Sequence, residues 1–206
     1  MTIKFGKEYF KFALTHQVCD YRAKGTWQRD YVRFIKRLFD LTGKKCLDFG
    51  SAMGVFTSAF RDANVDMQGV DISDWYIENC PFENAKKNLF TFQDDKMPFE
   101  DETFDFIHSQ QVLEHIPLDL AEVEIPELAR ICKPGAIFYI NTVGHSDEPV
   151  EERDDPTHVS CYAREVWYEL FDKWGWENIT PQYEKKWENE PFVLEYKWSQ
   201  MVFRKK

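Results

Sequence analysis

Two kinds of hydrophobic pattern alternate along the chain. Strands are predicted at 45–49, 67–72, 89–93, 104–109 and 136–142, and the last of these is apolar and continuous, as a central parallel strand should be. Helices are predicted between them, at 53–61 and 118–132. Strands that alternate with helices in this way are typical of a doubly wound α/β sheet.

The two ends of the chain extend this pattern. Residues 1–43 are predicted to be helical because of an apolar stripe made by Tyr31, Phe34, Ile35 and Leu38. The last third is predicted to form one helix and two strands, at 164–174, 176–181 and 193–203. No repeat or linker interrupts the order, so we expect a single domain over 1–206, with 1–43 as a helical cap on a core of 44–206.

Local signals mark two helix boundaries. Ser73 follows the second predicted strand and is the expected N-cap of the next helix. Lys133-Pro134-Gly135 predicts the end of the helix that runs to Cys132, before the strand at 136–142 begins.

Composition and charge narrow the function classes. With 206 residues, 43% of them hydrophobic and 17% aromatic, the chain can bury a substantial core. Its formal net charge of −10 repels phosphate backbones, which argues against a nucleic-acid substrate. We expect the basic tail Arg204-Lys205-Lys206 to be a solvated terminus.

Cysteine usage and hydropathy bear on the compartment. The five cysteines are scattered without a Cys-x-x-Cys pair, which favours a reducing compartment over a disulfide frame or a zinc site. No run approaches the ~20 apolar residues of a membrane span. We therefore expect a cytoplasmic protein without a membrane segment, and no pattern predicts its oligomeric state.

The segment from Lys45 to Gly54 carries the chemistry. It predicts a strand, a turn of small residues and a helix start, and Asp71 closes the next strand. Amides at a helix N-terminus can bind an anionic or polar ligand group, and an acid that ends the second strand can bind ribose hydroxyls. This combination is typical of a nucleoside-cofactor site, although Gly50 to Gly54 is equally compatible with a tight turn that binds nothing.

The spacing of the small residues favours one cofactor. A dinucleotide turn, G-x-G-x-x-G, needs glycines where Ala52 and Val55 stand, and Val55 does not fit. Asp48-Phe49-Gly50-Ser51-Ala52-Met53-Gly54 instead resembles the Asp-x-Gly-x-Gly-x-Gly layout of class I methyltransferases, which bind S-adenosyl-L-methionine (SAM). Ala52 replaces the middle glycine; it is still small but has less freedom at positive φ.

The resemblance continues in order along the chain. The matching segments are 47–54, 69–73, 97–99, 104–107, 112–116 and 128–135. The chain thus resembles class I SAM-dependent methyltransferases of the broad small-molecule and glycan-modifying, type 11-like kind over about residues 40–206. The resemblance implies a Rossmann-like, mostly parallel seven-stranded sheet with a final antiparallel strand, N-terminal helices as a lid, and SAM as cofactor.

The resemblance also implies roles for residues of the first two strands. Asp48 would organise the methionine end of SAM or cap the turn amides, and Asp71 would accept both ribose hydroxyls. Ile72 would pack on the adenine face. The backbone would approach the cofactor at Gly50, Ser51, Ala52 and Gly54.

Other cofactor contacts are less closely fixed. Either Asp94 or Asp95 would accept from the adenine amino group, because the segment after strand three is one residue shorter than the common form. Ser109 would face the cofactor from strand four. Trp27 and Arg29 are candidates to bind the methionine carboxylate from a lid, although a lid aromatic is more often part of the core.

Methyl transfer to an alcohol needs a base. The candidates are His115, after strand four, and His158, in the loop after strand five. In folds of this kind, that loop borders the substrate pocket. Asp155-Pro156-Thr157-His158-Val159 is similar to a segment of glycan-modifying relatives, and a nearby carboxylate would orient the His158 ring. We take His158 as the general base, with His115 or a purely structural histidine as the alternatives.

The sequence also raises the question of a metal. The loop acids Asp147, Glu151, Glu152, Asp154 and Asp155 offer oxygen ligands. Some quinone-pathway O-methyltransferases carry a metal-linked Glu-x-x-Glu-His, whereas here Gln111 replaces the first acid and leaves Glu114 and His115. We expect a solvated acidic loop and no metal.

These observations lead to one main functional hypothesis. We expect an enzyme that transfers a methyl group from SAM to a hydroxyl of a small molecule, sugar or glycan. The alternatives are N- or carboxyl-methylation of a metabolite and a catalytically silent SAM-binding module. A nicotinamide-linked oxidoreductase is disfavoured by Ala52 and Val55.

Overall fold

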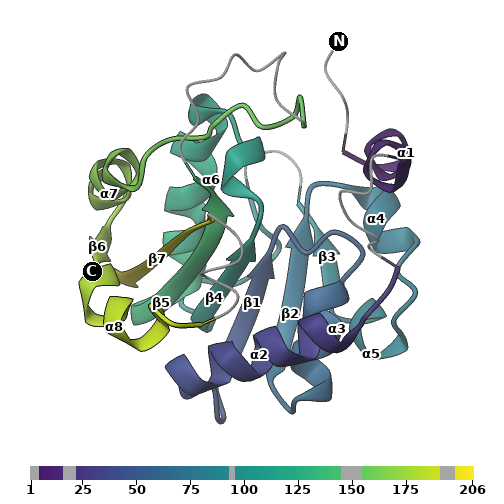
Figure 1. Ribbon diagram of the computed structural model, residues 1–206, viewed down its shortest axis with the longest axis horizontal. Helices are drawn as coiled ribbons and strands as arrows, with labels where there is room; N and C mark the ends of the chain where they lie inside the picture. The colour runs from purple at the N-terminus through teal and green to yellow at the C-terminus, as the bar shows by residue number, and fades with distance from the viewer. Residues whose placement is uncertain (1–4, 16–21, 93–95, 145–154, 191–197) are drawn as a thin grey trace. The chain divides into compact units, whose positions relative to one another are not determined.

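The computed structural model describes residues 5–15, 22–92, 96–144, 155–190 and 198–206. The chain forms two compact units, Met1–Pro98 and Phe99–Lys206, each with its own strands and helices (Figure 1). The single domain expected from the sequence, with its division after residue 43, stays a prediction. Within the described residues, no helix is long and apolar enough to cross a membrane.

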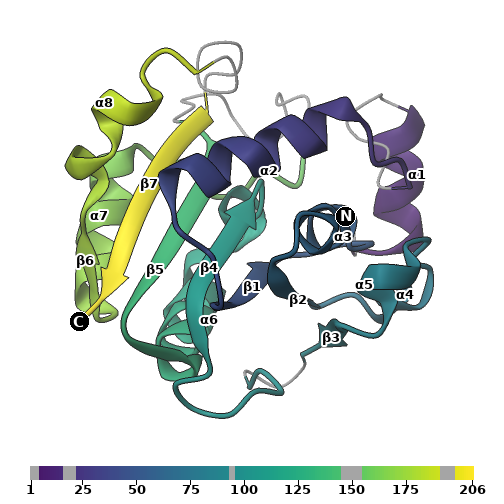
Figure 2. The same cartoon turned by 90° about the horizontal axis from the view of Figure 1, so that it is seen from below.

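The first unit contains three parallel strands, in the order β3-β2-β1. Its strands are β1 (Lys45–Phe49), β2 (Asp66–Asp71) and β3 (Leu89–Thr91). Its helices are α1 (Lys7–Thr15), α2 (Thr26–Leu38), α3 (Val55–Asp62), α4 (Asp74–Glu78) and α5 (Glu83–Lys86), which Figure 2 shows from below. The register pairs Asp48 with Gly69, so the carboxyl ends of β1 and β2 meet at one edge.

The second unit contains the other four strands, in the order β4-β5-β7-β6. They are β4 (Phe104–Gln110), β5 (Cys132–Val143), β6 (Trp176–Asn178) and β7 (Trp198–Lys205). Its helices are α6 (Leu118–Ile131), α7 (Arg164–Lys173) and α8 (Glu184–Trp187), with 3-10 turns η1 (Leu113–His115) and η3 (Thr180–Gln182). Strands β4 and β5 are parallel, whereas β7 is antiparallel to both β5 and β6.

The strand pattern confirms the predicted fold class. Within each unit, the strands of the described residues are parallel apart from β7, which lies between β5 and β6, where the resemblance placed a final antiparallel strand. The Rossmann-like, mostly parallel sheet is therefore present. The predicted N-cap is also confirmed, because the Ser73 hydroxyl accepts a hydrogen bond from the Tyr76 amide at 3.3 Å.

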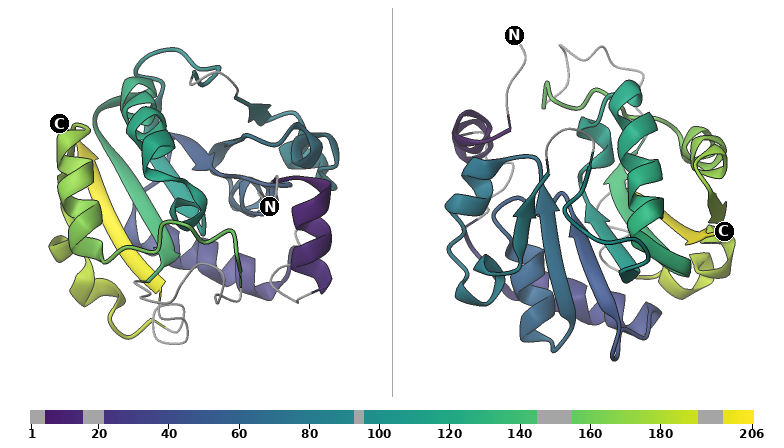
Figure 3. Two further views of the ribbon diagram at one scale, coloured as in Figure 1. Left: turned by 90° about the horizontal axis from the view of Figure 1, so that it is seen from above. Right: turned by 180° about the vertical axis from the view of Figure 1, so that it is seen from behind.

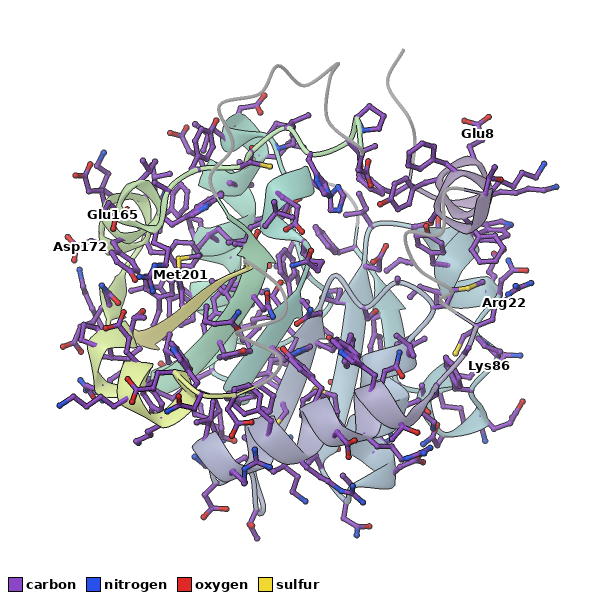
Figure 4. The ribbon with its side chains drawn as sticks, viewed as in Figure 1. Glu8, Arg22, Lys86, Glu165, Asp172 and Met201 are labelled. Carbon is purple, nitrogen blue, oxygen red and sulfur yellow. The ribbon has the colours of Figure 1, made fainter. Side chains whose placement is uncertain are left out.

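Aromatic packing holds the second unit together. Phe171 of α7 stacks on Phe203 of β7 with ring centroids 4.1 Å apart, and Phe138 of β5 contacts both Phe171 and Trp176. The Trp176 indole donates to the Ile125 carbonyl, so α6 and α7 pack on the same face of these strands (Figure 3). Figure 4 shows Glu165 and Asp172 pointing outward from α7, whereas Met201 of β7 is completely buried.

The predicted stop at Lys133-Pro134-Gly135 is wrong in one respect. Helix α6 ends at Ile131, but the chain enters β5 at once and these three residues belong to the strand. The register with β4 shifts between Phe104 and Phe106, so the Pro-Gly pair lies in an irregularity of the ladder. A bulge accommodates a proline, which cannot donate to the ladder, and a glycine, here at φ +78°.

The basic tail is likewise not a solvated terminus. Arg204 and Lys205 belong to β7, and Arg204 forms an ion pair with Glu177 at 3.5 Å. The Lys205 ammonium donates to the Cys132 carbonyl, and Lys206 pairs with Asp172. The predicted strand at 193–203 is β7 from Trp198 onward; residues 193–197 lie outside the described part of the chain.

Candidate active site

The turn after β1 folds back onto β2. The amides of Gly50 and Ser51 both donate to the Val70 carbonyl, at 2.9 and 3.0 Å. Gly50, Ala52 and Gly54 all have positive φ, of +75°, +45° and +80°. Glycine adopts such values readily, but an alanine there costs about 1 kcal/mol. The strain that the sequence predicted for Ala52 is thus present at the centre of the turn.

Asp71 ties this turn to the end of β2. One carboxylate oxygen accepts from the Ala52 amide at 2.8 Å and the other accepts from the Ser73 amide at 2.9 Å. Burial raises the pKa of Asp71 to about 6, although these two amides oppose the shift. Asp71 therefore also has a structural role, because it joins the turn to the residue that caps α4. Each oxygen still has a second lone pair with which to accept a hydroxyl.

Asp48 lies behind the turn, where it is 2% exposed. Its carboxylate accepts a hydrogen bond from the hydroxyl of Thr57, at 2.7 Å, on the first turn of α3. Thr57 is fully buried and was missed by the sequence reasoning. A threonine in the first turn of a helix is only a weak signal in a sequence. Its connection to the acid that ends β1 becomes evident only from the hydrogen bond in the structure.

Two features of the first unit fit a nucleoside with a polar tail. The Ser51 hydroxyl is buried and has no hydrogen-bond partner within the described residues, so a polar ligand group would satisfy it. Ile72, directly after Asp71, is 50% exposed and offers an apolar surface for a base. Asp94 and Asp95, the predicted adenine partners, lie outside the described part of the chain.

The lid candidates Trp27 and Arg29 lie on α2. Trp27 stacks on Tyr31, with ring centroids 5.3 Å apart, and also contacts Phe56. The Arg29 guanidinium is exposed and donates to the Thr26 hydroxyl. Trp27 is half-buried among aromatic residues, and its role in a lid stays a prediction.

The second unit brings the two candidate bases together. The rings of His115 and His158 contact edge to face, with centroids 4.8 Å apart. His115 ends η1, after β4, and His158 lies in the loop after β5. The two segments are held together because the Ser160 amide donates to the Glu114 carbonyl and the Ser160 hydroxyl donates to the Ile116 carbonyl.

Asp155 supports both histidines. It is 3% exposed, and its Oδ2 lies 3.8 Å from Nε2 of His158. Its Oδ1 accepts from both the amide and the hydroxyl of Thr157, and that hydroxyl lies 2.9 Å from Nδ1 of His115. The predicted carboxylate beside His158 is therefore present. Thr157 stood within the recognised segment, but the sequence gave no reason to connect it with His115.

The pKa values of two titratable groups in this cluster are displaced in opposite directions. Burial and the neighbouring His158 lower the pKa of His115 to about 4. Burial raises the pKa of Glu114 to about 7, against a hydrogen bond of 2.6 Å from the Thr142 hydroxyl. Around neutral pH, the His115 ring is therefore neutral and Glu114 lies close to its point of half-protonation.

Glu114, His115 and His158 could also bind a metal ion, since one ligand atom from each lies within 4.8 Å of the others. Two histidines and a carboxylate are a common ligand set for transition metals. Of the loop acids considered in the sequence, Asp147, Glu151, Glu152 and Asp154 lie outside the described residues.

Ser109 completes the predicted set. It lies on β4, is fully buried, and its hydroxyl has no hydrogen-bond partner in the described part of the chain. A buried hydroxyl without a partner is costly, so a ligand group at the end of β4 would stabilise it.

The fold and the glycine-rich turn define a class I methyltransferase. The sequence profile described as a methyltransferase domain matches residues 21–180, and the chain belongs to this family. The family uses SAM, and the residues around Asp71 fit a nucleoside of this kind. Residues 21–180 therefore form a methyltransferase domain of the family that uses SAM.

The curated relatives that match this chain are distant from it in sequence and longer than it. A ubiquinone biosynthesis O-methyltransferase from Methylococcus capsulatus is 28% identical over 124 residues, which cover 56% of this chain and 50% of the relative. A 24-methylenesterol C-methyltransferase 3 from Arabidopsis thaliana is also 28% identical, over 54% of this chain and 34% of the relative. The chain thus spans half or less of the length of these two relatives.

Solved structures share the fold over more of the chain. One belongs to a complex between the Haloferax volcanii Trm112 methyltransferase activator and a methyltransferase; it has a TM-score of 0.68 and 19% identity, and the match covers 98% of this chain and 97% of that one. A SAM-dependent methyltransferase from Archaeoglobus fulgidus has a TM-score of 0.64 and 17% identity, covering 82% of this chain and 74% of that one.

Proposed function

We propose that the protein methylates a hydroxyl group of a small molecule, sugar or glycan, with His158 as the general base. The observation that carries this proposal is the histidine pair with its shared carboxylate, Asp155. An amine needs only to be positioned, whereas an alcohol must lose a proton as its new bond forms. The O-methyltransferases among the relatives support the same class of acceptor.

The first unit supplies the cofactor contacts. Asp71 would accept the ribose hydroxyls, Ile72 would pack on the adenine, and the backbone from Gly50 to Gly54 would approach the methionine end. When bound, SAM supplies a methyl group on a positively charged sulfur. Asp48 would act indirectly, because its hydrogen bond to Thr57 fixes the end of β1 against α3.

The second unit supplies the proton acceptor. The His158 ring would accept the proton of the acceptor hydroxyl while that oxygen receives the methyl group that bound SAM supplies. Asp155, 3.8 Å from Nε2, stabilises the imidazolium that results. The proton then leaves to solvent, since the His158 side chain is 20% exposed.

Replacing His158 by glutamine tests the proposal. Turnover should fall roughly 100-fold, the usual size of a general-base contribution, while SAM affinity measured by calorimetry stays close to that of the wild type. His115→Gln serves as the matched variant. Undiminished turnover in His158→Gln would show that His158 is not the base. SAM binding without transfer to any acceptor would instead indicate a silent binding module.

A chelator arm of the same assay addresses the metal alternative. With His158 as a proton acceptor, EDTA leaves turnover unchanged. Loss of activity that magnesium or manganese restores would show that the Glu114, His115 and His158 cluster binds an ion, and the base assignment would have to be abandoned.

A further inference from the structure

A chain of hydrogen bonds fixes the tautomer of His115. The Thr157 hydroxyl lies 2.6 Å from Asp155 Oδ1, and because a carboxylate only accepts, the hydroxyl donates its single proton there. The same hydroxyl oxygen lies 2.9 Å from His115 Nδ1, so Nδ1 must donate to it. The Thr157 carbonyl, 3.3 Å from Nδ1, is also an acceptor only. Nδ1 therefore carries the hydrogen and the lone pair lies on Nε2.

His158 stands in a different environment. Asp155 Oδ2 lies 3.8 Å from its Nε2, and its amide donates to the Asp155 carbonyl at 3.1 Å. The His115 ring meets Asp155 through Thr157, whose hydroxyl lies 2.9 Å from Nδ1 of His115 and 2.6 Å from Oδ1 of Asp155. Two adjacent rings do not both carry a charge readily, so the proton belongs on the ring that faces the carboxylate.

We propose that Thr157 and Asp155 are positioning residues that give the two histidines different roles. Thr157 holds His115 as the neutral Nδ1–H tautomer, which accepts hydrogen bonds at Nε2. Asp155 stabilises the proton that His158 takes from the acceptor hydroxyl. This division of roles rests on the proposed hydroxyl methylation. The tautomer of His115, however, follows from the hydrogen bonds alone. Two titratable groups whose environments push their pKa values apart commonly take different acid–base roles in an active site.

The charged and titratable groups around the pair are few within the described residues. Glu114 precedes His115 and bonds to Thr142 of β5, and Asp155 bonds to Thr157.

Nitrogen NMR of protein labelled with ¹⁵N-histidine measures the tautomer without any acceptor substrate. The wild-type His115 resonances, assigned by their loss in His115→Gln, should show a protonated Nδ1 and an unprotonated Nε2 near neutral pH. Thr157→Val should weaken this preference, because only the Thr157 carbonyl at 3.3 Å is left to accept from Nδ1, and Thr157→Ser should keep it in full. A protonated Nε2 in the wild type, or an unchanged tautomer in Thr157→Val, would overturn the proposal.

Kinetics give a second readout with SAM affinity as the check on folding. Thr157→Val should lower kcat about 10-fold, as the loss of an orienting partner usually does, and Thr157→Ser should restore it. Thr103→Val, which removes a hydroxyl bonded only to the Glu100 carbonyl, is the matched control. Asp155→Asn should move the acidic limb of the pH–rate profile to lower pH, because the imidazolium loses its carboxylate. An unmoved limb would contradict the role of Asp155.

The two proposals fail in different ways. If hydroxyl methylation is wrong, acceptor assays fail while the His115 tautomer remains as described. If the positioning role is wrong, methyl transfer to a hydroxyl persists while the tautomer and the Thr157→Val kinetics do not change.

Discussion

At the residue scale, burial shifts the pKa values of three of the side chains with proposed roles or beside them. Asp71, Glu114 and His115 all have pKa values displaced chiefly by burial, to about 6, 7 and 4. Perturbed groups of this kind concentrate at functional sites. The sequence indicated Asp71 and His115, but their displacement depends on burial that a sequence pattern does not report.

Glu114 makes the stability of the protein depend on pH. Its folded-state pKa of about 7 lies above the unfolded value of 4.5, so the folded protein binds this proton more tightly. The resulting stabilisation is fully present below pH 4.5 and is lost as the pH rises through 7. Glu114→Gln should therefore gain roughly 2 kcal/mol over the wild type between pH 5 and pH 8, measured by urea unfolding.

Exposed Glu122 provides the control, because Glu122→Gln should follow the wild-type pH dependence. A Glu114→Gln variant whose advantage is the same at both pH values would show that burial does not disfavour the ionised form of this carboxyl.

At the element scale, the sequence predicted the order and type of most elements. Strand β1 has the predicted bounds, and α2 carries the predicted apolar stripe, because uninterrupted runs and helical spacing are local signals. The missed parts depend on contacts distant in sequence. Thr157 meets His115 across 42 positions, and the Pro134-Gly135 pair belongs to β5, where the register with β4 is irregular.

Gly69 lies on β2 beside the turn after β1, at a position where a side chain does not fit. A Cβ on Gly69 would lie 2.6 Å from both Thr57 Oγ1 and Leu89 Cδ2, and 2.7 Å from Ser51 Cβ. Gly69→Ala should therefore lower the free energy of unfolding by about 1–3 kcal/mol, as overpacking does, and should weaken SAM binding because Ser51 is displaced. Chemical denaturation and calorimetry measure the two effects.

Gly25→Ala is the matched control. A Cβ there would meet nothing closer than 3.4 Å, so the change should cost less than about 1 kcal/mol. Equal stability of Gly69→Ala and Gly25→Ala would mean that the packing of α3 and the turn against β2 is looser than described.

At the scale of the whole molecule, each of the two units carries some of the residues with proposed roles. The first carries the residues that fit a nucleoside, and the second carries the histidine pair with its carboxylate. The formal net charge of −10 disfavours a polyanionic acceptor. Family membership follows from the motifs that the sequence displays, whereas the acceptor depends on side chains gathered from several loops.

The most direct test of the account follows the methyl group itself. The purified chain is incubated with SAM labelled with ¹³C in its methyl group and with a panel of hydroxyl-, amine- and carboxylate-bearing acceptors. The carbon chemical shift of the product then identifies the atom that was methylated. We predict a methyl group on an ether oxygen, which His158→Gln strongly reduces. Label found only on nitrogen, carbon or a carboxylate would contradict the proposed chemistry.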